Sequence, residues 1–135
     1  PWYASLSYEE LEDDLLGTVD NDSKWRVGLG VLGMSGFSAT FIYEDRDNAA
    51  NINGGDTQAW NLQAAYDFGN NRIKASYGAF DDDSVVDDDF DAWAIGFQHN
   101  FSKRTDAQVI YRAKDNDLSS VGDDNTFALQ LNHSF

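Results

Sequence analysis

A strict alternation of apolar and polar residues over eight segments constrains this chain more than any other feature. In each segment, every second residue is apolar or aromatic, and the residues between are small, polar or charged. A period of two is typical of β-strands with two unlike faces, and helical spacing is nowhere sustained. The sequence therefore predicts an all-β chain that forms one unit over residues 1–135. The predicted strands cover about residues 2–10, 24–34, 37–45, 58–68, 72–80, 91–101, 105–114 and 126–135.

The predicted strands are joined by connections that alternate in length. Short turns are expected near residues 35–36, 69–71 and 102–104. Long connections are expected at about residues 11–23, 46–57, 81–91 and 115–125. Strands of this length with short turns at one end and long loops at the other are typical of an antiparallel up-and-down barrel.

Aromatic residues recur 33 to 35 residues apart along the chain, which is the length of one hairpin unit. A tyrosine closes each odd strand, and a tryptophan or phenylalanine opens each even strand. A second group of aromatic residues lies toward the short turns. Two such rings are typical of the belts that mark the two interfaces of a membrane barrel. The girdle predicted at the long-loop end consists of Tyr8, Trp25, Tyr43, Trp60, Tyr77, Trp93, Tyr111 and Phe127.

The charge of the chain is strongly negative and unevenly distributed. There are 24 Asp and Glu residues against 9 Lys and Arg residues, and 18 of the acids fall in the four long connections. This sign is wrong for binding a nucleic-acid backbone. Alternation alone would also fit a soluble barrel with an apolar interior. The aromatic rings and the hydrophilic opposite face favour a closed transmembrane β-barrel whose apolar side meets lipid, because an open strand edge in hydrocarbon leaves backbone groups unpaired.

Several segments resemble a known family. Residues 127–135, FALQLNHSF, resemble the closing strand of Gram-negative outer-membrane barrels, whose final aromatic residue, here Phe135, is read by the barrel-assembly machinery. Residues 100–111 and 64–71 are similar to strand–turn–strand units of the general porin family, and residues 3–10 to one of its mid-barrel strands. The match is to the C-terminal half of such proteins.

The resemblance implies a location and a function. It implies a Gram-negative outer-membrane porin that contacts membrane lipids and lipopolysaccharide and assembles as a homotrimer. The chain would supply eight of about sixteen strands around a water-filled channel for passive diffusion of ions and small hydrophilic solutes. The charged residues expected to line that channel are Lys24, Arg26, Glu44, Asp67, Arg72, Lys74, Asp106, Arg112 and Lys114.

The alternative is a small closed eight-stranded barrel with a structural or adhesive role through its acidic loops. The interior of such a barrel is just wide enough for side chains. In that case the lining bases would pair with interior acids, which are Glu9, Glu44, Asp67 and Asp106.

Other kinds of site have weaker sequence support. The acidic segments 45–56, 81–91 and 115–117 carry oxygen ligands that suit calcium, but they lack the ligand order of a calcium loop, so calcium binding stays open. His99 and His133 each precede an aromatic residue by two positions and are expected at the membrane interface. No catalytic or phosphate-binding motif is present, and the chain contains no cysteine. We therefore expect no enzyme activity, no cofactor and no metal site.

Overall fold

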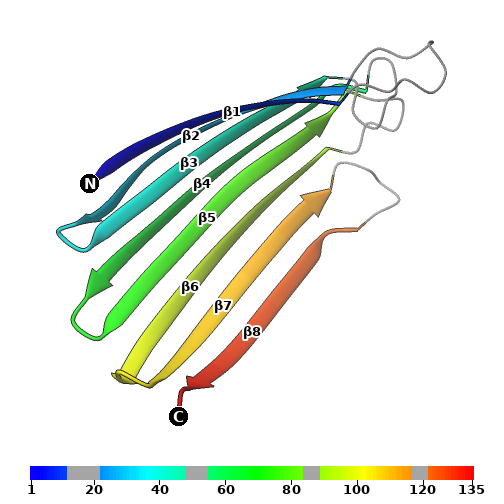
Figure 1. The fold of residues 1–135 in the computed structure, drawn as a ribbon. Coiled ribbons are helices and arrows are strands. Elements are labelled where there is room, and N and C mark those ends of the chain that lie inside the picture. Colours follow the sequence, from blue (N-terminus) through cyan, green and yellow to red (C-terminus); the bar gives the residue numbers. More distant parts are fainter. Residues whose placement is uncertain (12–21, 48–54, 84–88, 117–121) are drawn as a thin grey trace.

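The computed structural model of the chain is one eight-stranded antiparallel sheet (Figure 1). It describes residues 1–11, 22–47, 55–83, 89–116 and 122–135. Each strand is hydrogen-bonded to the next one in sequence, which confirms the predicted antiparallel meander. Among the described residues, no helix is long and apolar enough to cross a bilayer. The strands are β1 (Trp2–Leu11), β2 (Asp22–Met34), β3 (Phe37–Asp47), β4 (Thr57–Phe68), β5 (Asn71–Asp82), β6 (Phe90–Ser102), β7 (Thr105–Asn116) and β8 (Asp124–His133).

Strand ends differ from the predicted ones by a few residues. Strands β2 and β3 extend toward the long-loop end beyond their predicted limits, and β8 ends at His133, two residues before the predicted end. The predicted long connections lie largely outside the described residues, so the acidic loops and any calcium binding by them stay a prediction.

Tight turns join the strands at the short-turn end. Ser35 and Gly36 form the turn between β2 and β3, with φ angles of 52° and 83°. Two consecutive positive φ angles are typical of the hairpin turn whose twist matches that of the flanking strands. A Cβ atom on Gly36 would lie 2.6 Å from the carbonyl oxygen of Asp67, so a side chain does not fit there. A two-residue turn at 69–70 joins β4 to β5, and another at 103–104 joins β6 to β7.

The sheet is open in the described strands, so closure into a barrel stays a prediction. Strands β1 and β8 are its two edges, and each is hydrogen-bonded to one neighbour (Figure 1). A sheet closes into a barrel only if it is sheared and tilted enough for its first and last strands to meet. Apolar side chains are most exposed on these edges, where Leu6 and Leu129 are each 77% accessible.

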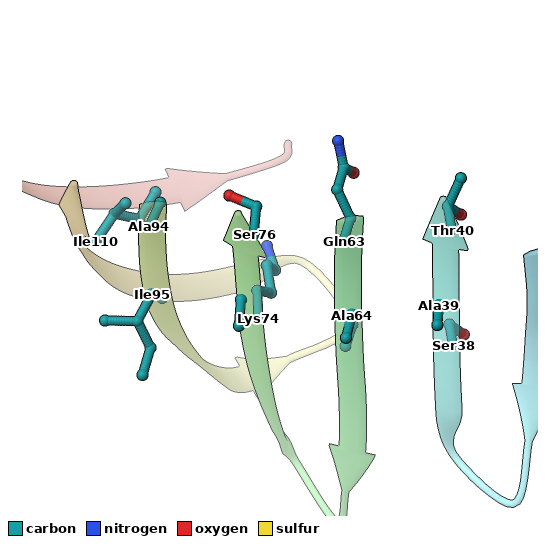
Figure 2. A pocket seen from close by; sticks show the side chains of 13 residues that line it. Ser38, Ala39, Thr40, Gln63, Ala64, Lys74, Ser76, Ala94, Ile95 and Ile110 are labelled. Atoms are coloured by element: carbon teal, nitrogen blue, oxygen red, sulfur yellow. The ribbon is translucent and has the colours of Figure 1, made fainter. Parts of the chain in front are cut away.

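The register places most apolar positions on one face of the sheet and most polar positions on the other. Tyr8 lies opposite Trp25, Phe41 opposite Leu62, and Ile73 opposite Phe97. We call the apolar side the outer face and the polar side the inner face. Figure 2 shows the separation, since Gln63 and Ser76 project to one side of the sheet and Ile95 to the other.

The inner face is the more sheltered of the two. On β6, Ile95 on the outer face is 50% exposed, whereas its neighbours Ala94 and Gly96 on the inner face are half-buried. The buried hydrophobic residues of the described chain are Val31 and Ala113. Large apolar side chains are instead exposed along the outer face of every strand, and a soluble monomer rarely exposes so large an apolar surface. The sheet therefore has no core of the kind that two packed layers would form.

Candidate functional site on the polar face

The inner face carries all nine residues that the sequence singled out as lining residues. Their places follow from cross-strand pairing, since Arg26 lies opposite Glu44, and Asp67 lies opposite Arg72. Lys114 lies opposite Ala92, within the same alternating set. A period of two puts every second residue of a strand on one side, so a single register brings charges from five strands onto one surface. The members of the set are Lys24, Arg26, Glu44, Asp67, Arg72, Lys74, Asp106, Arg112 and Lys114.

Four ion pairs link neighbouring strands on this face. The nitrogen–oxygen distances are 2.9 Å for Lys24–Glu9, 2.7 Å for Arg26–Glu44, 2.9 Å for Arg46–Asp22 and 2.8 Å for Arg72–Asp67. The first three join β1, β2 and β3 near the long-loop end. Three of the six predicted lining bases are thus neutralised by a carboxylate on the adjacent strand.

Sequence reasoning missed the pair formed by Arg46 and Asp22. Both residues were expected in long connections, whereas β2 begins at Asp22 and β3 runs through Arg46. Among the described residues, Asp22 is the most enclosed charged one, with 4% of its surface exposed. Continuing the alternation of the two strands by one step would have placed both side chains on the inner face.

A chain of hydrogen bonds extends across the C-terminal strands. Lys74 Nζ donates to Gln108 Oε1 at 3.3 Å, and Gln108 in turn donates to Gln130 on β8 at 2.6 Å. Gln130 donates to Asn132 at 2.7 Å, and Asn132 donates to Asp106 at 3.0 Å. Asp106 therefore accepts this hydrogen bond from an amide. In this region, amide side chains link neighbouring strands, as carboxylates do between β1 and β3.

Arg112 and Lys114 on β7 have no carboxylate partner among the described residues. Lys114 Nζ instead lies 3.9 Å from the ring centroid of Phe90. Phe90 is stacked on Phe80 of the neighbouring strand, with the centroids 5.2 Å apart and the planes inclined by 22°. These two rings lie on the inner face, and sequence reasoning missed them. Their position in the alternation could have revealed them, because Phe80 is an even number of residues from Lys74 on β5 and so falls on the same side of that strand.

Two hollows lie on the inner face. The larger, of about 410 Å³, extends over β3 to β7 and is lined by Thr40, Gln63, Lys74 and Ser76, among others (Figure 2). The smaller, of about 270 Å³, lies nearer the long-loop end, and Arg112 is one of its lining residues. The two hollows meet at Ser76 and Ala94. Together they form a trough across the middle of the sheet, lined by small residues and by polar side chains such as Gln63 and Lys74.

The outer face carries an aromatic belt made of the eight predicted girdle residues. Directly opposite each other on adjacent strands lie the pairs Tyr8–Trp25, Tyr43–Trp60, Tyr77–Trp93 and Tyr111–Phe127. Between these pairs, ring centroids lie 5.1 Å apart for Trp25–Tyr43, 5.3 Å for Trp60–Tyr77 and 5.4 Å for Trp93–Tyr111. One ring follows another across all eight strands.

Three tyrosines of the belt donate hydrogen bonds to carboxylates. The acceptors and distances are Glu10 at 3.1 Å for Tyr8, Asp45 at 3.2 Å for Tyr43 and Asp91 at 3.1 Å for Tyr77. Each acceptor lies on the same face as its tyrosine, two residues farther along the sheet toward the long-loop end. The belt thus has an apolar side toward the middle of the sheet and a polar side toward the loops, which is the arrangement that suits headgroup depth.

The two histidines lie on the outer face at the short-turn end and have structural partners. His99 Nδ1 is 2.7 Å from Asn71 Oδ1, and its ring packs edge-on against Phe101. His133 repeats the arrangement with Thr105 and with Phe135, the exposed final residue. In the part of the chain that the structure describes, no three potential metal ligands come together.

Comparison with known proteins agrees with this geometry. A family model described as Gram-negative porin matches residues 1–119 of the chain. Neither the search of curated proteins nor the search of solved structures gave a significant match.

Proposed function

Since this chain belongs to the Gram-negative porin family, we propose that it forms wall strands of a water-filled channel for passive diffusion of ions and small hydrophilic solutes. Proteins of this family lie in the outer membrane of Gram-negative bacteria, and this is the location of the chain. Its surroundings are therefore outer-membrane lipid and lipopolysaccharide. The family also supports a channel that is not an enzyme.

The observation that carries the proposal is the unlike character of the two faces. The outer face has exposed apolar side chains with an aromatic belt at the long-loop end, as a surface in contact with lipid requires. The inner face has charges, amides and hydroxyl groups around an open trough, as a surface in contact with water requires. In this proposal the nine charged residues named above line the channel, and Phe135 is the assembly signal.

The open edges support the larger barrel of the two sequence hypotheses. Unpaired edges in hydrocarbon would leave backbone donors and acceptors without partners, at a cost of several kcal/mol each. Strands β1 and β8 therefore require neighbours beyond the eight described here. We propose that about eight further strands of the same protein complete a barrel of about sixteen, a size that leaves an aqueous channel, and that three such barrels associate as a homotrimer.

Conductance in planar lipid bilayers tests the proposal. The full-length protein should give discrete current steps whose size rises in proportion to the conductivity of the bulk salt solution, because the ions move through water. The mass of the intact protein should be about twice the 15.1 kDa of this chain. A 15.1 kDa protein that inserts and passes almost no current would contradict the proposal and support the small filled barrel.

A further inference from the structure

We infer that the smaller hollow of the inner face binds small aromatic carboxylates. We call it the Phe80–Arg112 hollow, since Phe80 lines its loop-side end and Arg112 its β7 side. The inference deepens the proposed function and rests on it, because solutes would reach the hollow through the channel. Three features carry it: a floor of small residues, an aromatic wall, and a guanidinium group that has no carboxylate partner among the described residues.

The floor of the hollow consists of small residues on two adjacent strands. Gly78 lies opposite Ala92, and Ser76 lies opposite Ala94. The space above them is about 270 Å³. A Cβ atom on Gly78 would lie 2.8 Å from the carbonyl oxygen of Trp60 and 2.8 Å from Asn61 Nδ2, so Gly78 is the residue that fits beside Asn61. Asn61 on β4 lines the hollow next to this floor.

The loop-side wall is the stacked pair of Phe80 and Phe90. Their rings are half-buried, and they lie on the face that carries the charged residues and amides of the sheet. An aromatic ring that entered the recess would find ring faces and edges beside it, and such contacts favour aromatic over aliphatic solutes. Lys114, which lies over Phe90, adds a positive charge at the same wall.

The β7 wall supplies the charge recognition. Arg112 is exposed and, among the described residues, has no ion-pair partner. A guanidinium group can donate two parallel hydrogen bonds to one carboxylate. Arg26 and Arg72 on the same face already have carboxylate partners at their guanidinium groups. Lys114 has Asp124 opposite it on β8, whereas Arg112 lies opposite Thr126. The positive charge at Arg112 thus favours an anion, and the neighbouring rings favour an aromatic one.

Block of the ion current by small solutes tests this inference. Benzoate should reduce the potassium chloride current at a concentration about fivefold or more below that of acetate, which has the charge without the ring. Benzylammonium, which has the ring with the opposite charge, should block the current only at concentrations similar to those of acetate. Phe90→Leu and Arg112→Gln should each raise the half-blocking concentration of benzoate by about fivefold or more. Phe97→Leu on the outer face of β6 and Arg104→Gln in a short turn serve as matched controls and should leave it unchanged.

The outcomes separate this inference from the proposed function. If the channel conducts potassium chloride but benzoate and acetate block it alike, the inference is overturned and the proposed function is unaffected. If the protein does not conduct, the proposed function fails. Binding of benzoate to the protein in lipid nanodiscs, followed by saturation-transfer NMR, then decides the inference by itself. A signal that Arg112→Gln abolishes supports the hollow, and a signal equal in both proteins, or none, overturns it.

Discussion

The inner face has two regions that use the same residue types differently. In the β1–β3 region, Arg26 lies opposite Glu44 and forms an ion pair with it. In the β5–β7 region, Arg112 lies opposite Ala94 and has no carboxylate partner in the described chain. Both arginines lie on alternating positions of the same sheet face. In this comparison, the arginine with a carboxylate opposite it forms an ion pair, and the arginine with an alanine opposite it has no carboxylate partner among the described residues.

The two regions also differ in how they hold their long side chains. Carboxylates fix Lys24 and Arg46 between β1 and β3, and the Arg46 partner Asp22 is almost fully buried. Between β5 and β7, an amide holds Lys74 and an aromatic ring holds Lys114. On the same face, Asp124 lies opposite Lys114, whereas Arg112 lies opposite Ala94 and Thr126. The first region is therefore a stabilising one, and the second presents a guanidinium group, that of Arg112, with no carboxylate partner among the described residues.

Stability should separate the two regions most clearly. Arg46→Gln leaves the enclosed Asp22 carboxylate without its guanidinium partner. Removing one member of a buried pair costs about 3–5 kcal/mol, and because Arg46 is partly exposed, we expect a loss of about 2 kcal/mol in the free energy of unfolding. Arg112→Gln should change it by less than about 0.5 kcal/mol. Urea unfolding in lipid vesicles, followed by tryptophan fluorescence, measures both. Equal losses of unfolding free energy in the two variants would contradict the conclusion that the β1–β3 region contributes more to stability.

Ion selectivity should separate the regions in the opposite sense. A unit charge about 7 Å from an ion in water changes its energy by roughly 0.6 kcal/mol, or about threefold in local concentration. Because chloride falls and potassium rises by that factor when the charge is removed, Arg112→Gln should lower the chloride-to-potassium permeability ratio by up to about sevenfold at low salt. The double variant Arg26→Gln with Glu44→Gln removes a neutral pair and should leave the ratio unchanged. Reversal potentials in a salt gradient test this, and a shift of the same size in both variants would contradict it.

Local pattern was enough to predict the eight strands and their two faces. Alternation assigns each side chain to a face, and a two-residue turn then fixes every cross-strand partner, as the turn at 69–70 does for Asp67 and Arg72. Closure could not be predicted in this way, because it depends on the number and shear of all strands in the barrel.

The parts of the inner face that were missed lie at strand ends. Asp22 and Arg46 were predicted to lie in connections because the alternation weakens where charged residues crowd the end of a strand. Phe80 and Phe90 are apolar but lie at positions of the polar face, so a rule that assigns every apolar residue to the lipid-facing side misses them. Sites of this kind are expected to break the alternation, because a solute-binding wall needs apolar groups on the wet side.

The smallest expected effect concerns the contact between Lys114 and Phe90. A double-mutant cycle of Lys114→Met and Phe90→Leu should give a coupling of about 0.5 kcal/mol in the free energy of unfolding, which is typical of a partly exposed cation–π contact. The ring does not neutralise the ammonium group, so Phe90→Leu should leave the permeability ratio for simple salts unchanged, whereas Lys114→Met should lower it. If Phe90→Leu shifts the ratio as much as Lys114→Met does, the ring acts by placing the charge. The β5–β7 region would then depend on a fixed partner just as the β1–β3 region does.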